Sequence, residues 1–311
     1  MAFDIIGDVH GQAEKLHALL ARLGYRERSG AFRHPDRTAI FVGDFVDRGP
    51  RQIDTVMTAR RMVDANSALA IMGNHEFNAI AWNTPNPDGS GEFLRPHGGI
   101  AGIKNREQHE AFLAEVKDNP ALHSELTNWF LTLPLWLDLP GLRVVHACWH
   151  DIYMKELQPS LTPDLQLTKE LVVAASRSGT MEFRAVECVT KGLEIDLPEG
   201  HMFHDKGGHP RHNVRIRWWD TLATTYRELA LMPPDLRERL PNIQITNDAR
   251  SKYDDAKPVF FGHYWMSGLP TLQSPTAACV DYSAGMGGPL MAYRWDGEPT
   301  LDRRNFVSSD I

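Results

Sequence analysis

The order of apolar and polar segments near the amino terminus most limits what this chain can fold into. Residues 3–6 form a short apolar run typical of a buried strand, and residues 12–23 carry apolar side chains at helical spacing until Gly24. The same order continues with a strand, a helix and a strand at 38–42, 53–63 and 68–72. This alternation predicts an α/β chain with a βαβ core and a parallel sheet.

Two long segments interrupt this pattern further along the chain. Residues 83–135 begin as loop sequence rich in Pro, Gly and Asn and continue with helical spacing, whereas residues 151–257 show no regular period. We interpret both as insertions in a single domain that spans residues 1–311. The remaining apolar runs predict strands at 142–145, 258–261, 277–282 and 290–295.

Charge and cysteine usage exclude several classes of protein. The 311 residues include 33 Lys and Arg against 40 Asp and Glu, a formal charge of -7 that disfavours nucleic acid as a partner. The three cysteines, Cys148, Cys188 and Cys279, are widely spaced and form no CxxC pair, so neither a disulfide framework nor a thiolate zinc site is predicted. A reducing compartment fits this pattern best.

The apolar run at the amino terminus indicates where in the cell the protein is expected. It covers only residues 3–6 and is interrupted by Asp4, which is too short for a secretion signal or a membrane span. We therefore expect a cytoplasmic protein without a membrane partner.

Side chains that can bind metal ions follow five of the predicted strands. Because the carboxyl ends of parallel strands form the ligand-binding crevice of an α/β sheet, segments far apart in sequence can converge there. Carboxylate oxygen and imidazole nitrogen suit divalent metal ions, and two adjacent ions need a carboxylate between them, for which we choose Asp44. The strand-end residues are Asp8 and His10; Asp44, Asp47 and Arg48; Asn74 and His75; His146; and His263.

Three sequence blocks carry a family resemblance. Residues 7–11 read Gly-Asp-Val-His-Gly, residues 43–49 read Gly-Asp-Phe-Val-Asp-Arg-Gly, and residues 73–76 read Gly-Asn-His-Glu. They resemble the signature blocks of the calcineurin-like metallophosphoesterases, in the branch of the protein Ser/Thr phosphatases. Residues 145–147 and 262–263 are similar to the last two histidine segments of that family, although Ala-Cys follows His146 where Gly-Gly or Ala-Gly is usual.

The resemblance implies a fold and a set of metal ligands. The implied fold is a central β-sandwich of mixed sheets flanked by helices, with helical and loop insertions. Two divalent metal ions are implied; we expect Mn to support activity in vitro, and Fe or Zn also suits the ligands. The implied ligands are Asp8, His10 and the bridging Asp44 for one ion, and Asp44, Asn74, His146 and His263 for the other.

The resemblance also assigns catalytic roles. His75 would donate a proton to the leaving oxygen, Asp47 would orient His75, and Arg48 would bind the phosphoryl oxygens. These roles are chemically reasonable because slow phosphate ester hydrolysis requires an activated water, charge neutralisation and leaving-group protonation together. A histidine with a pKa near neutral suits the last of these tasks.

The expected reaction is hydrolysis of phosphate monoesters by a hydroxide that bridges the two metal ions. The substrate would be a phosphoprotein or a small phosphoester, and the sequence blocks favour a protein phosphatase of the Ser/Thr type. A dinucleoside polyphosphate hydrolase of the diadenosine tetraphosphate type is the alternative. A catalytically inactive scaffold of the same fold is a remote third possibility, since every expected ligand is present.

A basic segment in the second insertion offers a further phosphate contact. Residues 201–217 include Lys206, Arg211, Arg215 and Arg217, a pattern that is more often a solvated loop. Arg215 and Arg217 alternate with apolar residues as in a strand, so we hypothesise that one of them faces the site. The neighbouring pair Tyr264-Trp265 could stack on an aromatic leaving group, although packing is the more usual role of such residues.

Overall fold

A five-stranded sheet forms one half of the core in the computed structural model, which describes residues 1–204, 210–246 and 253–310. The strand order is β15-β14-β1-β4-β5, in which β1, β4 and β5 are parallel and β14 and β15 are antiparallel to their neighbours. The strands are β1 (Ala2–Ile6), β4 (Arg37–Phe41), β5 (Ala68–Ala70), β14 (Met291–Trp295) and β15 (Phe306–Ser308).

A second sheet of four strands packs against the first. Its order is β13-β12-β7-β6, with β7, β12 and β13 parallel and β6 antiparallel to β7. These strands are β6 (Trp136–Leu139), β7 (Leu142–Val145), β12 (Val259–Phe261) and β13 (Ala277–Cys279). Apolar side chains from both sheets form one buried cluster between them, which includes Phe3, Ile5, Ile40, Val42, Leu142, Val144, Phe260 and Val280.

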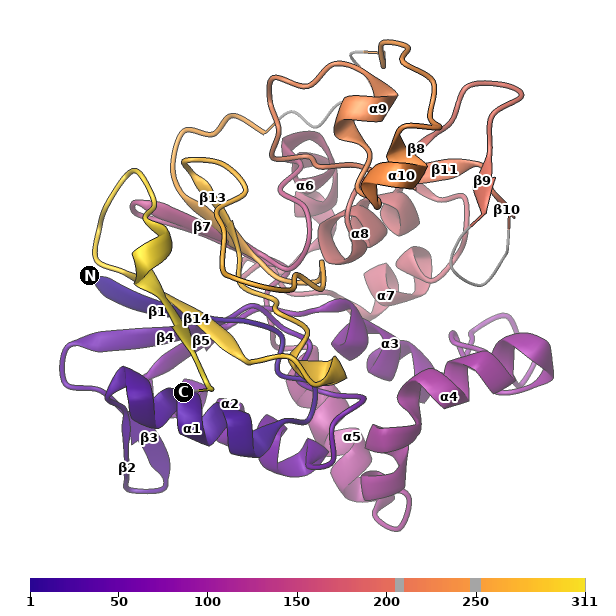
Figure 1. Ribbon diagram of the computed structural model, residues 1–311. Coiled ribbons are helices and arrows are strands. Elements are labelled where there is room, and N and C mark those ends of the chain that lie inside the picture. Colours follow the sequence, from indigo (N-terminus) through magenta and orange to yellow (C-terminus); the bar gives the residue numbers. More distant parts are fainter. Residues whose placement is uncertain (205–209, 247–252, 311) are drawn as a thin grey trace.

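Helices α1 (Ala13–Leu23) and α2 (Gln52–Asp64) cover the other face of the first sheet, as Figure 1 shows. Helix α1 buries Leu16, Leu20 and Leu23 in a second, larger apolar cluster and ends at Gly24, whose φ of 97° is left-handed. Only glycine adopts that conformation at low energetic cost, so Gly24 is a C-cap residue as its sequence position predicts. A hairpin of β2 (Arg26–Arg28) and β3 (Ala31–Arg33) follows.

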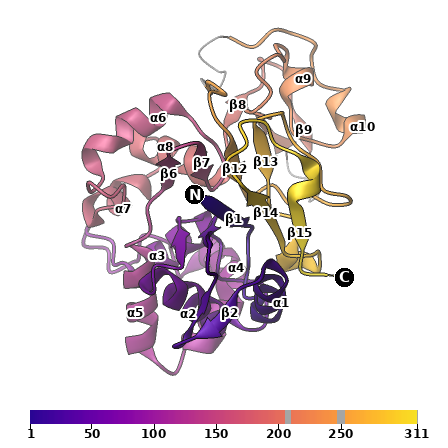
Figure 2. The same ribbon diagram turned by 90° about the vertical axis from the view of Figure 1, so that its left-hand side faces the viewer.

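The first insertion lies below the second in Figures 1 and 2, and both lie to the right of the sandwich in Figure 1. After α3 (Asn74–Asn83), the first insertion supplies α4 (Gly99–Val116) and α5 (Pro120–Phe130). The second insertion contains helices α6 (Asp151–Leu157), α7 (Lys169–Ala175), α8 (Met181–Lys191), α9 (Tyr226–Leu229) and α10 (Pro234–Arg237). Its short strands are β8 (Glu194–Asp196), β9 (Phe203–His204), β10 (Pro210–Arg211) and β11 (Asn213–Arg215).

The mixed β-sandwich flanked by helices is the fold class that the resemblance implied, and the prediction is confirmed. The simpler expectation of a parallel sheet holds for the central strands but is wrong for β6, β14 and β15, which are antiparallel. The second insertion also contains more helix than its sequence indicated, since α6 and α7 span seven residues each and α8 spans eleven. Within the described ranges, none of the helices combines the length and apolar character that a bilayer span requires.

Candidate metal centre

The predicted strand-end residues converge where the parallel strands of both sheets end. Segments after β1, β4 and β5 approach segments after β7 and β12, since the carboxyl ends of all five strands meet at one edge of the sandwich. The Asp8 carboxylate accepts a hydrogen bond of 2.9 Å from the His263 N–H, joining residues 255 positions apart. Asp8 and His10 are almost completely buried.

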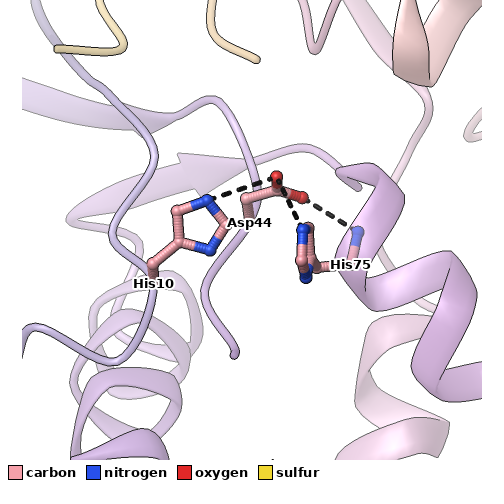
Figure 3. A group of neighbouring side chains, drawn as sticks. All are labelled: His10, Asp44 and His75. Atoms are coloured by element: carbon pink, nitrogen blue, oxygen red, sulfur yellow. Dashed lines mark hydrogen bonds and ion pairs between the residues drawn. The ribbon is translucent and has the colours of Figure 1, made fainter. Parts of the chain in front are cut away.

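Asp44 occupies the middle of this arrangement. Its Oδ2 atom lies 3.6 Å from His10 Nε2, 3.4 Å from His146 Nε2 and 3.9 Å from His75 Nε2. Figure 3 shows His10 and His75 on either side of the carboxylate, and Oδ1 accepts a 2.9 Å hydrogen bond from the His75 N–H. A carboxylate surrounded by imidazole nitrogens at these distances could help to hold divalent cations.

Backbone carbonyls orient two of the imidazole rings. His10 Nδ1 donates to the Val46 carbonyl at 3.0 Å, and His146 Nδ1 donates to the Val42 carbonyl at 2.7 Å. Because Nδ1 bonds to a carbonyl in each ring, Nε2 is the nitrogen that faces Asp44. This is the arrangement in which histidine binds a metal ion while its other nitrogen fixes the ring.

Asn74 joins the remaining two histidines. Its Oδ1 atom lies 2.9 Å from His263 Nδ1 and 3.2 Å from His146 Nε2. Two compact groups can therefore each hold a metal ion: His10, Asp44 and His75, and Asp44, His146 and His263. Asp44 belongs to both groups, whereas the first contains His75 rather than Asp8.

Asp8 belongs to neither compact group. Its Oδ1 atom is buried without a hydrogen-bond partner among the described residues, as is His10 Nε2. Burial raises the pKa of Asp8 well above its usual value, and the Asp281 carboxylate raises it further. A methyl group at Gly262 would lie 1.9 Å from Asp8 Oδ1, so only glycine at this position admits the carboxylate.

This donor set fits divalent metal ions. Buried polar atoms normally have hydrogen-bond partners, so the two orphaned atoms, Asp8 Oδ1 and His10 Nε2, indicate that something else satisfies them. The surrounding donors are carboxylate, carboxamide and imidazole, which suit Mn, Fe and Zn. Two cations would also offset the repulsion among the buried Asp8, Asp44 and Asp281 carboxylates.

The backbone at the site is strained. Five of the sequence-predicted site residues have positive φ angles, which non-glycine residues rarely adopt: His10 at 48°, Asp44 at 53°, Asp47 at 72°, Arg48 at 71° and His263 at 71°. Such conformations cost roughly 1–3 kcal/mol each and cluster at functional sites. Tight packing of the surrounding loops therefore holds the ligands in place.

Glu76 ties two of these loops together. Its carboxylate accepts hydrogen bonds from the backbone N–H groups of Asp44 and Phe45, each at 2.8 Å, and of Gly73 at 3.0 Å. Burial raises its pKa to about 7. The last residue of the Gly-Asn-His-Glu block thus fixes the loop after β4 to the start of α3.

His75 is bonded to Asp47 as expected of an oriented proton donor. The distance from His75 Nδ1 to Asp47 Oδ2 is 2.5 Å. Burial lowers the pKa of His75, but the Asp44 and Asp47 carboxylates outweigh it and raise the pKa above its usual value. Arg48 lies beside this pair, with its guanidinium carbon 4.1 Å from the centre of the Trp265 ring. The arrangement can protonate a leaving oxygen and bind phosphoryl oxygens.

A family model confirms the resemblance on which these expectations rest. The model of the calcineurin-like phosphoesterases matches residues 1–175, which is more than half of the chain. This chain is a calcineurin-like phosphoesterase. Membership of that family implies metal-dependent hydrolysis of phosphoric esters at a dinuclear centre of divalent metal ions.

Relatives of this phosphoesterase are named for nucleotide hydrolysis. An asymmetrical bis(5'-nucleosyl)-tetraphosphatase from Oceanobacillus iheyensis is 45% identical over 148 residues, covering 47% of this chain and 55% of the relative. A symmetrical bis(5'-nucleosyl)-tetraphosphatase from Actinobacillus pleuropneumoniae is 22% identical over 305 residues, covering 95% and 96%. The phosphoesterase thus spans about half or less of the length of the asymmetrical relatives that it matches.

A solved structure shows the same fold. A protein serine/threonine phosphatase from Saccharomyces cerevisiae superimposes with a TM-score of 0.52 at 16% identity, covering 99% of this chain and 78% of that chain. At 16% identity, this similarity is evidence for the fold of the phosphoesterase and not for its substrate.

Of the two arginines in the basic segment for which we expected a contact with the site, only Arg215 lines the pocket. Arg215 lines the pocket at the site, with Nη1 3.2 Å from His263 Nε2 and Nη2 3.1 Å from Glu194 Oε1. Arg217 is directed elsewhere: it donates to the Glu228 carbonyl and lies 3.5 Å from Asp220. Strand β11 ends at Arg215, so the alternation that placed both arginines on one face does not continue. Lys206 lies outside the described residues.

Two buried residues near the site carry no motif in the sequence. Asp281 follows β13 and accepts hydrogen bonds from the backbone N–H groups of Trp265 and Ser283, at 2.7 and 2.8 Å. His109 from α4 contacts Asp47 at 2.6 Å. The strand predicted at 277–282 includes Asp281, but β13 ends at Cys279 in the structure. His109 sits within a helical pattern, so neither residue had a usable signal in the sequence.

Metal binding should stabilise the phosphoesterase. At a Mn²⁺ concentration about 100-fold above Kd, the gain of roughly 2.7 kcal/mol corresponds to a rise in melting temperature of about 5 °C. Asp8→Asn should reduce the rise because a carboxylate facing the site is lost, while the exposed Asp36→Asn should not. Thermal melts with and without Mn²⁺ measure this, and equal rises in both variants would contradict it.

Proposed function

We propose that this phosphoesterase hydrolyses dinucleoside polyphosphates, the alternative of the sequence analysis. The observation that carries the proposal is a pocket of about 650 Å³ in front of Asp44, Asn74, His75 and His263. Residues of both insertions line it. Six cationic side chains line the pocket: Arg48, Arg95, Lys104, Lys191, Arg211 and Arg215.

Three of these cations are available to a substrate. Lys191 pairs with Glu187 and Arg215 pairs with Glu194, but Arg48, Arg95 and Lys104 form no ion pair with any carboxylate in the described part of the chain. A monoester carries one phosphoryl group, which the metal ions and Arg48 suffice to bind. Further cations in the same pocket favour a substrate with several phosphates.

Arg95 is the most informative of the three. Its guanidinium is partly buried and donates only to neutral groups, Asn78 Oδ1 at 2.5 Å and Gln108 Oε1 at 2.7 Å. Burial lowers its pKa, and the Asp47 and Glu187 carboxylates raise it only in part. A phosphate chain that extends from the metal centre toward α4 would supply further compensation.

In this proposal, different site residues bind the metal ions, bind the phosphoryl oxygens and donate the proton. Asp8, His10, Asp44, Asn74, His146 and His263 would hold the divalent metal ions. The chemistry that such ions supply when bound is neutralisation of phosphoryl oxygens and deprotonation of an attacking water near neutral pH. Arg48 binds the phosphoryl oxygens, and His75, held by Asp47, protonates the leaving oxygen.

A phosphoprotein phosphatase of the Ser/Thr type is the second candidate. The observation in its favour is the His75–Asp47 pair, since a serine or threonine alkoxide leaves only when protonated. A nucleotide phosphate leaves more readily and needs a proton donor less. The sequence blocks favour this candidate, and the charge of the pocket favours the first.

Parallel assays separate the two candidates. Purified protein stripped of metal is incubated with diadenosine tetraphosphate, a phosphoserine peptide or p-nitrophenyl phosphate, with and without Mn²⁺. We expect Mn²⁺-dependent hydrolysis with the highest kcat/KM for the dinucleotide. Preference for the peptide would favour the protein phosphatase, and binding of metal without hydrolysis of any substrate would point to the inactive scaffold.

Loss of Arg95 should weaken binding of the longer substrate only. For Arg95→Gln we expect KM for diadenosine tetraphosphate to rise roughly 10- to 100-fold, from the ~1.5–3 kcal/mol of a hydrogen bond to a charged group. The KM for p-nitrophenyl phosphate should not change. Arg106→Gln is the matched control, since Arg106 lies on α4 but does not line the pocket. An equal rise for both substrates would contradict the role of Arg95.

A further inference from the structure

Asp47 is bonded to two histidines, one on each carboxylate oxygen. Its Oδ2 atom lies 2.5 Å from His75 Nδ1, and its Oδ1 atom lies 2.6 Å from His109 Nδ1. His109 is only 1% exposed and belongs to α4, in the first insertion. A residue 62 positions from Asp47 thus completes the hydrogen bonding of the carboxylate that holds the proton donor.

The surroundings of His109 fix its hydrogen on Nδ1. The ring packs against Phe112 and Trp82, with centroid distances of 5.0 and 6.2 Å, and Nε2 is buried without a hydrogen-bond partner among the described residues. A hydrogen on Nε2 would be an unsatisfied buried donor, whereas a hydrogen on Nδ1 bonds to Asp47. His109 is therefore a fixed donor to Asp47 that does not reach the substrate pocket.

The two bonds hold the Asp47 carboxylate in one orientation. The Asp47 backbone is constrained as well, with a φ of 72° and a hydrogen bond of 2.6 Å from its N–H to Gln52 Oε1. Burial raises the pKa of Asp47, but the bonds from His109 and His75 outweigh it and bring the pKa to about 2. Without His109, the Oδ1 atom would be a buried acceptor without a partner, and rotation of the carboxylate could relieve this.

We infer that His109 is a positioning residue that fixes Asp47, and through Asp47 orients His75 for protonation of the leaving oxygen. The inference rests on the proposed role of His75 and on the phosphoesterase activity of the family, and it is independent of which substrate the chain uses. Helix α4 also carries Lys104 and Gln108 into the pocket. The first insertion thereby contributes to both substrate binding and the orientation of the proton donor.

Two substitutions of His109 separate positioning from packing. His109→Leu fills much of the buried space but removes the hydrogen bond to Asp47. His109→Asn is the matched variant, because its side-chain amide nitrogen lies close to the position of Nδ1 and can donate to the same oxygen. Neither change removes a proposed metal ligand, so metal content should stay at the wild-type level in both.

Leaving-group dependence is the signature of this role. The 2,4-dinitrophenolate ion leaves without protonation, whereas phenolate is a much poorer leaving group and depends on the proton donor. For His109→Leu we expect kcat for phenyl phosphate to fall roughly 10- to 100-fold, the usual loss when an orienting partner is removed. The kcat for 2,4-dinitrophenyl phosphate should remain nearly unchanged, and so should KM for both esters.

The experiment measures kcat, KM and bound metal for the wild type, both His109 variants and His75→Asn in the holoenzyme. Selective loss for phenyl phosphate in His109→Leu, with recovery in His109→Asn, supports the inference. Equal loss for both esters in His109→Leu, or no loss, overturns it while the role of His75 stands. If His75→Asn itself shows no leaving-group dependence, the role of His75 fails and the inference fails with it.

Discussion

Asp44→Asn is expected to abolish turnover. The substitution replaces a carboxylate that lies 3.4 Å from His146 and 3.6 Å from His10 with a neutral amide, and it places an N–H group where a bridging oxygen is needed. Because both compact ligand groups contain Asp44, neither proposed metal position remains complete. We expect kcat to fall by more than the roughly 10²–10³-fold that follows loss of one electrostatic contact in an active site.

The measurement pairs kcat for p-nitrophenyl phosphate with metal content by mass spectrometry. Asp118→Asn, an exposed substitution on the surface, is the control and should keep both activity and metal. A circular dichroism spectrum like that of the wild type would show that Asp44→Asn folds. An Asp44→Asn protein with full metal content and wild-type kcat would rule out the bridging assignment.

His75→Asn is expected to retain metal and lose most of the rate. Asparagine can still donate to Asp47 from the position of Nδ1, but it has no group at the position of Nε2 that could protonate a leaving oxygen. The expected loss in kcat for phenyl phosphate is about 10²–10⁴-fold, the usual contribution of a general acid.

Metal analysis decides between two roles for His75. Its Nε2 lies 3.9 Å from Asp44 Oδ2, and His75 belongs to one of the two compact groups that can hold a metal ion. Retention of metal in His75→Asn supports the proton donor, whereas loss of metal would identify His75 as a ligand instead. His34→Asn, outside the site, should change neither quantity.

Much of the site follows from local sequence. A short apolar run, a glycine and a polar ligand predict a strand that ends at a tight turn, and this pattern placed Asp8, Asp44, Asn74, His146 and His263 correctly at strand ends. The prediction succeeds because strand propensity and turn chemistry depend on neighbouring residues. The residue types at these strand ends themselves indicate divalent metal ions.

Other features depend on contacts between distant segments. His109 lies within an ordinary helical pattern, and only the packing of α4 against the loop after β4 brings it to Asp47. The position of the Arg95 side chain likewise depends on tertiary contacts, because its guanidinium donates hydrogen bonds to Asn78 and Gln108. Arg215 and Arg217 belong to one alternating pattern in the sequence. Because β11 ends at Arg215, the Arg217 side chain lies beside Asp220 instead of lining the pocket.

The amino-acid sequence by itself determined the α/β class, the candidate ligands at the strand ends and the family resemblance. The tertiary structure alone decided that the outer strands are antiparallel, that Asp281 lies beside Asp8, and that both insertions line one cationic pocket. The physical reason is the range of the interactions involved. Turns and strands form from residues next to one another, whereas a pocket wall and a hydrogen bond across 62 positions form only when the chain packs.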